Sequence, residues 1–167
     1  SETITLAFLP SILTSMIFER VEKKYLLTDG DRAKLLEKIA PMLVPDKYGH
    51  STISSLYLDT PDFRIVRASI EAKEWGHAYK EKLRLRTYGT PTADSKTFLE
   101  IKKKYKGVVY KRRIAMTLAE AMDYINGGAK PPDSQIMREI DYSMNFYSHP
   151  KPAAVVSYER DAFFVRD

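Results

Sequence analysis

Lysine and arginine recur at every second position in short segments of this 167-residue chain. Residues 78–88 hold Lys80, Lys82, Arg84 and Arg86, with leucines at two of the positions between them. Because a β-strand sends successive side chains to opposite faces, the four cations share one face and the leucines share the other. Such a face suits phosphate, since Arg grips phosphate oxygens in a bidentate way and Lys acts as a point charge.

Four further segments are expected to carry charged stripes of the same kind. They are Arg20, Glu22 and Lys24 in 18–28, Glu100, Lys102 and Lys104 in 96–105, Lys111 and Arg113 in 108–116, and Tyr158 and Arg160 in 153–165. A solvated sheet face mixes acids and bases, and like charges on neighbouring strands repel each other. The stripes therefore predict an anion between them, and strands that curl into a barrel would enclose it. Lys103 and Arg112 are expected on the opposite face.

Positive charge is concentrated in one third of the sequence. Residues 78–113 contain twelve Lys or Arg and three acids, whereas the rest of the chain contains 15 basic and 19 acidic residues. An asymmetry of this size points to an anionic partner. Nucleic acid is the weaker candidate, because few aromatic residues for base stacking lie among the basic positions.

Composition excludes several other classes of site. The absence of cysteine rules out disulfides, thiolate metal sites and a Cys nucleophile, and the three scattered histidines disfavour zinc. No glycine-rich phosphate loop or dinucleotide fingerprint is present. The most apolar segment, 4–18, contains Pro10 and is shorter than the ~20 residues of a membrane helix. We expect it to be a short helix or lead-in on a soluble cytoplasmic domain, and we expect no membrane span.

The strands and helices that must position these charged stripes are predicted from the spacing of polar and apolar residues. Period-two patterns predict strands over 18–28, 51–58, 78–88, 96–105, 108–116 and 153–165, and helical patterns occur over 29–42, 63–72, 117–126 and 133–147. Asp29 or Asp31 is expected to cap the first helix, and Thr117 with Glu120 forms a capping box for the third. The whole chain, 1–167 with 1–17 as lead-in, is therefore predicted to be one α+β domain of antiparallel strands and inserted helices.

Six motifs occur in an order and spacing that resemble a known family. They are R-x-E-x-K-Y (Arg20, Glu22, Lys24, Tyr25), S-L-Y-L-D-T (55–60), K-L-R-L-R-T-Y-G (82–89), F-L-E-I-K-K-K (98–104), G-V-V-Y-K-R-R (107–113) and S-Y-E-R-D-A-F (157–163). From about residue 18 onward the chain resembles the VTC domain, the polyphosphate polymerase branch of the CYTH-like triphosphate tunnel metalloenzymes.

The resemblance implies an antiparallel β-barrel, the triphosphate tunnel, with helices packed outside. It also implies transfer of the γ-phosphate of ATP onto a polyphosphate chain with Mn²⁺ or Mg²⁺. Such chemistry rests on positioning and charge neutralisation. The family's catalytic basic residues match Lys24, Arg84, Arg86, Lys102, Lys111 and Arg160, and the phosphate-binding positions that join them are Lys82, Arg113, Tyr158 and Arg20.

The sequence departs from the family pattern at its C-terminal end. Family members add further tunnel strands, one of them with a metal-binding glutamate, after the strand that matches 153–165. This chain stops at Asp167, so the barrel is expected to be incomplete there. Glu22 and Glu100 face the expected lumen and are candidate metal ligands, with ion pairs to neighbouring Lys or Arg as the alternative.

Three related functions stay open at this stage. The first is a polyphosphate-synthesising phosphotransferase, the second a hydrolase of triphosphate or polyphosphate, and the third a non-catalytic polyphosphate-binding sensor. Transferase and hydrolase differ in the acceptor, phosphate or water, and charged stripes do not separate them.

Overall fold

The computed structural model describes residues 2–8, 21–74, 79–106 and 108–166. The chain divides into two compact units, one made of Ser1–Lys47 with Phe163–Asp167 and the other of Tyr48–Ala162. Strands β3 (Leu43–Asp59) and β7 (Lys151–Val165) run from one unit into the other. Each unit is described by itself below.

The smaller unit combines a β-ribbon with a helix. Strand β1 (Glu2–Phe8) pairs antiparallel with β2 (Val21–Leu27). Helix α1 (Asp29–Ile39) follows β2 and continues into the short 3₁₀ helix η1 (Ala40–Met42), where Pro41 suits a first-turn position. A short helix or a lead-in segment was expected here. Residues 2–8 form a strand and not a helix, because their backbone pairs with β2, and residues 9–17 lie outside the described residues.

Capping of α1 differs from the expectation. The N-cap is Thr28, whose hydroxyl oxygen accepts the amide of Asp31 at 3.2 Å, and neither Asp29 nor Asp31 is the cap. The two aspartates lie in the first turn instead, where their negative charge favours the N-terminal end of the helix dipole.

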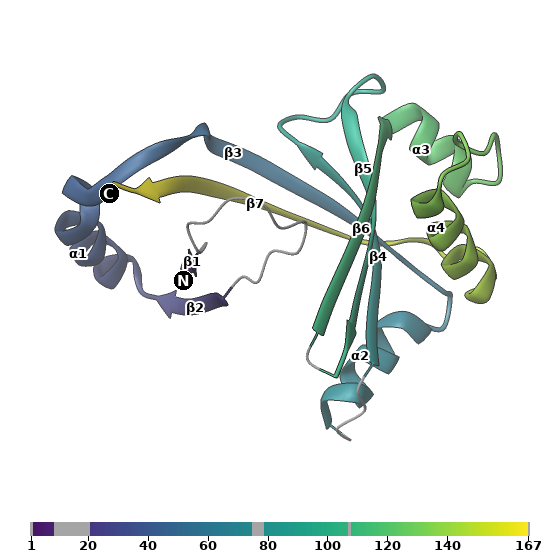
Figure 1. Ribbon diagram of the computed structural model, residues 1–167, viewed down its shortest axis with the longest axis horizontal. Coiled ribbons are helices and arrows are strands. Elements are labelled where there is room, and N and C mark those ends of the chain that lie inside the picture. Colours follow the sequence, from purple (N-terminus) through teal and green to yellow (C-terminus); the bar gives the residue numbers. More distant parts are fainter. Residues whose placement is uncertain (1, 9–20, 75–78, 107, 167) are drawn as a thin grey trace. The chain divides into compact units, whose positions relative to one another are not determined.

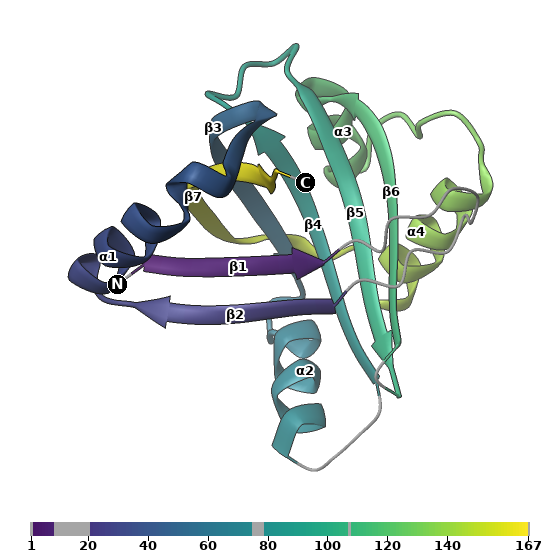
Figure 2. The same cartoon turned by 60° about the vertical axis from the view of Figure 1, so that its left-hand side comes forward.

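The larger unit is built on a five-stranded sheet of order β6-β5-β4-β3-β7 (Figure 1). Three of its strands follow one another in the chain, β4 (Tyr79–Tyr88), β5 (Lys96–Tyr105) and the edge strand β6 (Val108–Thr117), and Figure 2 shows them side by side. Antiparallel pairing joins β3 to β4, β4 to β5 and β5 to β6. Side-chain contacts between β3 and β7 join His50 to Asp161, Thr52 to Glu159 and Ser54 to Ser157. Residue numbers rise along β3 as they fall along β7, so these two strands are antiparallel too.

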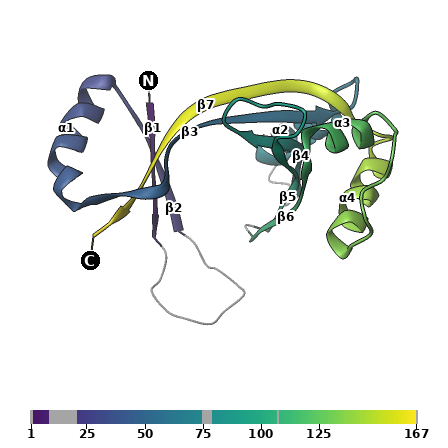
Figure 3. The same ribbon diagram turned by 90° about the horizontal axis from the view of Figure 1, so that it is seen from above.

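Three helices cover one face of this sheet: α2 (Arg64–Glu74), α3 (Leu118–Ile125) and α4 (Gln135–Phe146). Figure 3 shows α3 and α4 on the same side of β4–β6. The core between sheet and helices joins Leu83 and Leu85 of β4 and Leu99 and Ile101 of β5 to Ile140 of α4, all at most 2% exposed. Burial of apolar area at about 25 cal/mol per Å² is what holds the helices on this face.

Local signals in the sequence fix the ends of the helices. The capping box of α3 forms as predicted, because the Thr117 hydroxyl accepts the Glu120 amide and the Glu120 carboxylate accepts the Thr117 amide. Ser134 caps α4 through the amide of Met137. The buried Asp59 carboxylate accepts the amides of Ile65 and Val66 and thereby anchors the start of α2.

The predicted α+β fold of antiparallel strands with helices packed outside is confirmed. The sheet is open between β6 and β7 in the part of the chain that the structure describes, as expected for an incomplete barrel. No described helix has both the length and the apolar character that a membrane crossing requires.

Candidate functional site

The face of the sheet that the helices leave uncovered is lined by cations. Along β4, Glu81, Leu83 and Leu85 are buried towards the helices, whereas Lys82 is exposed and Arg84 is partly buried on the other side. This alternation is what the sequence pattern predicts. One strand therefore separates the hydrophobic core from a row of positive charge.

The pairing register aligns the cations of β4, β5 and β6. Lys102 of β5 lies opposite Lys82 and Lys111, and Glu100 lies opposite Arg84 and Arg113. All three strands are fully described, and Glu100 is the only acid that they contribute to this face. We call it the basic face, and on β4, β5 and β6 it comprises Lys80, Lys82, Arg84, Arg86, Lys102, Lys104, Lys111 and Arg113.

Strand β7 adds to the basic face from the other edge. Its Ser157 and Glu159 contact Ser54 and Thr52 of β3, which lie on the helix-covered face with Leu56 and Leu58. Alternation along β7 therefore puts Tyr158 and Arg160 on the basic face, opposite the β3 residues Ile53 and Ser51 in the register of these contacts. Sequence reasoning had assigned Tyr158 and Arg160 to this face.

Glu100 is the electrostatic centre of the basic face. Its side chain is 1% exposed, and Oε2 accepts hydrogen bonds from Nε of Arg84 at 2.8 Å and lies 2.8 Å from Nη2 of the same residue. The ammonium of Lys111 lies 3.0 Å from Oε1, and no other described residue hydrogen-bonds to this oxygen. A buried carboxylate is tolerated only with such partners, so Glu100 depends on two of the cations for its place in the sheet.

These contacts also decide the protonation state of Glu100. Burial alone would raise the pKa of the carboxyl, but the hydrogen bonds and positive charges of Lys111 and Arg84 outweigh it and lower the pKa below its ordinary value. Glu100 is therefore a carboxylate at neutral pH. It cancels only part of the positive charge that β4, β5 and β6 place on this face.

Neutral groups also hold the guanidinium groups of this face in place. Nε of Arg86 donates to the Ser55 hydroxyl at 3.2 Å, and Nη1 of Arg84 donates to the Tyr57 hydroxyl at 3.4 Å. The guanidinium of Arg113 lies 4.6 Å from the centre of the Phe98 ring, within the range of a cation–π contact. These partners orient the guanidinium groups without neutralising them.

The structure thus brings together most of the predicted site residues. Arg84, Arg86, Lys102, Lys111 and Arg160 lie on the basic face, as do Lys82, Arg113 and Tyr158. Lys24 and Glu22 are on β2 in the smaller unit, and Arg20 lies outside the described residues.

A divalent metal finds no set of ligands among the described residues. No three His, Cys, Asp or Glu side chains gather there in a way that would hold an ion. Glu100, one of the two candidate ligands, is already engaged by Arg84 and Lys111, which repel a further cation. In this part of the molecule its observed role is the ion pair.

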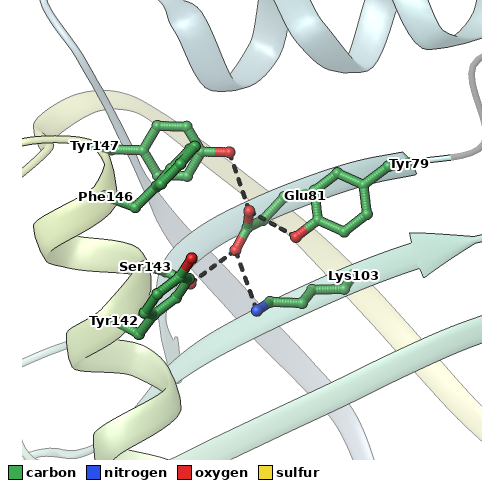
Figure 4. A pocket seen from close by; sticks show the side chains of 7 residues that line it. All are labelled: Tyr79, Glu81, Lys103, Tyr142, Ser143, Phe146 and Tyr147. Carbon is green, nitrogen blue, oxygen red and sulfur yellow. Dashed lines mark hydrogen bonds and ion pairs between the residues drawn. The ribbon is translucent and has the colours of Figure 1, made fainter.

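A second buried carboxylate lies on the helix-covered face of the same sheet. Glu81 is 6% exposed and accepts hydrogen bonds from the hydroxyls of Tyr79, Ser143 and Tyr147 at 2.8–3.0 Å. The ammonium of Lys103 lies 3.8 Å away. Together with the rings of Tyr142 and Phe146 these residues line a small pocket of about 210 Å³ (Figure 4).

Sequence reasoning gave ion pairs with neighbouring Lys or Arg as the alternative role of Glu100, and the structure shows them, but it did not identify the hydroxyl partners of Glu81. Ser55, Tyr57 and Phe98 of the basic face were missed because short polar and aromatic residues in a strand carry no charge signal. A signal for Glu81 was present, since it occupies the same strand face as Leu83 and Leu85 and an acid there needs donors. The predicted placement of Lys103 and Arg112 on the opposite face is confirmed by their contacts with Glu81 and Glu139.

The family model described as the VTC domain matches residues 19–167. This range includes β2 and all five strands of the β6-β5-β4-β3-β7 sheet. No curated protein matches the chain.

Proposed function

The chain belongs to the VTC domain family, and from this premise we propose that it is a phosphotransferase acting on polyphosphate. In the proposed reaction the terminal oxygen of a polyphosphate chain attacks the γ-phosphorus of ATP. The bond from that phosphorus to the β,γ-bridging oxygen breaks, and ADP leaves with its electron pair. The chain grows by one phosphate, and the basic face is where donor and acceptor would lie.

The observation that carries this proposal is the excess of positive charge on one open sheet face. Eight Lys or Arg residues of β4, β5 and β6 share that face with one acid, and the pairing register aligns them. Phosphoryl transfer asks little covalent chemistry of a protein and depends on positioning and charge neutralisation. A face of oriented cations supplies both.

Arg84 is the residue best prepared to hold a reacting phosphate. A guanidinium has five N–H donors, and the contacts described above use three of them, two on Glu100 and one on Tyr57. The remaining two are available to phosphate oxygens. Because Glu100 and Tyr57 fix the guanidinium beforehand, little side-chain freedom is lost when phosphate binds.

We assign the other predicted residues to the same task. Arg86, Lys102, Lys111 and Arg160 are proposed to neutralise charge at the reacting phosphates, and Lys82, Arg113 and Tyr158 to hold neighbouring ones. Lys24 and Arg20 remain predicted members of the site. Mn²⁺ or Mg²⁺ also remains a prediction, with Glu22 as its untested candidate ligand.

The proposal is tested by incubating the chain with ATP and Mn²⁺ and resolving the products by size. Long polyphosphate chains are the expected product. Release of orthophosphate alone would identify a hydrolase, and binding of tripolyphosphate without turnover would identify a sensor. Arg84→Ala is expected to weaken tripolyphosphate binding at least tenfold, a loss of about 1.4 kcal/mol or more.

Arg112→Ala is the matched control. It removes an arginine from β6, next to Lys111, but on the helix-covered face where Arg112 lies 3.5 Å from Glu139. Tripolyphosphate affinity should not change in this variant. Equal losses in both variants would mean that only the overall charge matters, which contradicts a specific site.

A further inference from the structure

The pocket at Glu81 lies on the helix-covered face of the sheet and has no part in the proposed function. It combines one buried carboxylate with the ammonium of Lys103 and four aromatic rings (Figure 4). Pockets for drug-sized ligands measure about 300–1,000 Å³, whereas this one measures about 210 Å³. The space therefore suits the head of a single side chain and not a nucleotide.

The two oxygens of the Glu81 carboxylate are not equally satisfied. Oε2 accepts hydrogen bonds from the hydroxyls of Tyr79 at 2.8 Å and Tyr147 at 3.0 Å. Burial and the neighbouring carboxylate raise the pKa of both tyrosines, so their hydroxyls stay protonated and donate. Oε1 accepts one hydrogen bond, from the Ser143 hydroxyl at 2.8 Å, and no second one from the described residues. Because a carboxylate oxygen has two acceptor positions, Oε1 can take one more donor.

The cation that already lies beside Glu81 is held weakly. Nζ of Lys103 is 3.8 Å from Oε1, which is beyond hydrogen-bond distance, and the lysine side chain is 28% exposed. An ion pair of this kind adds little stability, and the flexible stem of a lysine lets its ammonium turn into solvent. A ligand with a better-placed cation can therefore replace Lys103 at Oε1.

The aromatic rings around the carboxylate suit a planar cation. Tyr142 and Phe146, one turn apart on α4, are 66% and 55% exposed, and their stacked rings have centroids 6.3 Å apart. The Tyr147 ring already accepts a guanidinium, since Cζ of Arg64 lies 5.6 Å from its centre. A guanidinium stacks flat on such rings and has five N–H donors, whereas an ammonium is a compact, strongly hydrated charge. The ligand chemistry that fits both the rings and Glu81 is therefore a guanidinium.

The exposed rings of Tyr142 and Phe146 indicate how this guanidinium is presented. Tyrosine, phenylalanine and arginine are enriched where proteins bind one another, and a few such side chains act as anchors. A free guanidine would use the pocket alone, whereas a peptide would also cover the two rings at its rim. The exposure of these rings therefore favours a peptide as the carrier of the guanidinium.

We infer that the pocket at Glu81 binds an arginine side chain of a partner protein. The guanidinium donates to Oε1 in place of Lys103 and stacks on the rings of Tyr142 and Phe146. Glu81 keeps its hydrogen bonds to the three hydroxyls, so it continues to join the sheet to α4. Because the pocket and the basic face lie on opposite sides of the sheet, this inference is independent of phosphate binding.

The test titrates small probes into the isotope-labelled full chain and follows the amide signals by NMR. Acetyl-Gly-Arg-Gly-amide should shift the signals of Glu81 and Ser143 and reach saturation. The same peptide with citrulline, which has a similar shape but no charge, should bind at least tenfold more weakly. The lysine peptide and ethylguanidine should each bind about threefold or more weakly. The first of these stacks less well on the rings, and the second has no chain to cover them.

Two substitutions at the carboxylate should change the affinity for the arginine peptide in opposite directions. Glu81→Gln keeps the shape of the side chain but removes its charge, and should weaken binding at least tenfold. Lys103→Met removes the competing ammonium and should strengthen binding about two- to fivefold. Phe146→Ala removes an exposed ring and should weaken binding about threefold. Near-UV circular dichroism establishes that each variant is folded, and Lys103→Met with the citrulline peptide decides the matter if Glu81→Gln is not.

Glu139→Gln is the matched control for Glu81→Gln. It removes one acid from α4, where Glu139 pairs with Arg112 at 3.5 Å and does not line the pocket. The affinity for the arginine peptide should not change in this variant. Equal losses in Glu139→Gln and Glu81→Gln would mean that only the overall charge matters, which would overturn the site.

Other results would also overturn the inference. An arginine peptide that causes no saturable shift, or a citrulline peptide that binds equally well, would show that the pocket does not bind a guanidinium. Weaker binding in Lys103→Met would show that Lys103 holds the ligand and does not compete with it. Ethylguanidine that binds as tightly as the peptide would overturn the choice of a protein partner. None of these results bears on tripolyphosphate binding through Arg84, so the proposed function is tested separately.

Discussion

Glu81 and Glu100 are two buried carboxylates on opposite faces of one sheet, and they are stabilised in different ways. Glu81 is surrounded by the neutral hydroxyls of Tyr79, Ser143 and Tyr147, with Lys103 at 3.8 Å. Glu100 is held by two cations, Arg84 and Lys111, at 2.8–3.0 Å.

The difference shows what each face is built for. The hydrogen bonds from Ser143 and Tyr147 join Glu81 of β4 to α4 and its C-cap residue, so this carboxylate fastens a helix onto the sheet. The partners of Glu100 lie on an open face and carry charge in excess of one carboxylate. The carboxylate among hydroxyls is a structural fastening, whereas in the proposed function the carboxylate among excess cations organises a site for a stronger anion.

The largest expected effect is on stability and concerns Glu81, the structural carboxylate of this comparison. Glu81→Ala leaves three hydroxyl donors without an acceptor between sheet and helix, and should lower the free energy of unfolding by about 3 kcal/mol. Tyr79→Phe removes one donor and should cost about 1 kcal/mol. Urea denaturation followed by fluorescence measures both. Because Glu81 does not face the basic side, the folded fraction should bind tripolyphosphate as before. A clear loss of affinity would break the distinction between the two faces.

Glu100→Gln tests the other side of the comparison. Gln keeps the shape of the side chain but frees Arg84 and Lys111 from a competing negative charge. Tripolyphosphate affinity should rise about tenfold, or about 1.4 kcal/mol, while the free protein becomes less stable. Calorimetry with EDTA present separates this effect from any metal. A fall in affinity under these conditions would show that Glu100 acts mainly by positioning Arg84.

The smallest expected effect concerns an exposed ion cluster on β3 and β7. Both ring nitrogens of His50 lie near carboxylate oxygens, Nε2 at 2.9 Å from Glu159 and Nδ1 at 2.8 Å from Asp161. Only the protonated ring has a proton on both nitrogens. The hydrogen bond to Asp161 is the main cause that raises the pKa of His50, with smaller contributions from Glu159.

The sign of the pH dependence follows from that direction. The pKa of His50 is higher in the folded than in the unfolded state. The stabilisation of the folded state by protonated His50 is therefore complete at pH values below the unfolded pKa of about 6.5, and it is lost as the pH rises through the folded pKa. His50→Gln should abolish this part of the dependence, and NMR titration of the ring measures the pKa directly. A folded pKa at or below 6.5 would contradict the prediction. Exposure keeps the effect small, in contrast with the buried pair at Glu100.

The alternation of side chains along single strands was available from the sequence. Residues 80–86 alternate basic with apolar or acidic side chains, and period two allows only one division of these residues between the faces. The same reasoning placed Lys103 and Arg112 away from the basic face, and both contact groups of the helix-covered side. The capping box at Thr117 was also predictable, because its hydrogen bonds join residues three positions apart.

The register in which the strands pair was decided only by the tertiary structure. The register puts Glu100 between Arg84 and Arg113 and sets lysine opposite lysine at the other end, and a slip of one residue would have moved every side chain to the other face. The strand at residues 2–8 depends likewise on pairing with β2, which no local pattern specifies. The sequence by itself determined which side chains carry charge and which of them share a face. Only tertiary structure determined which charges meet, because each such contact joins residues far apart in the chain.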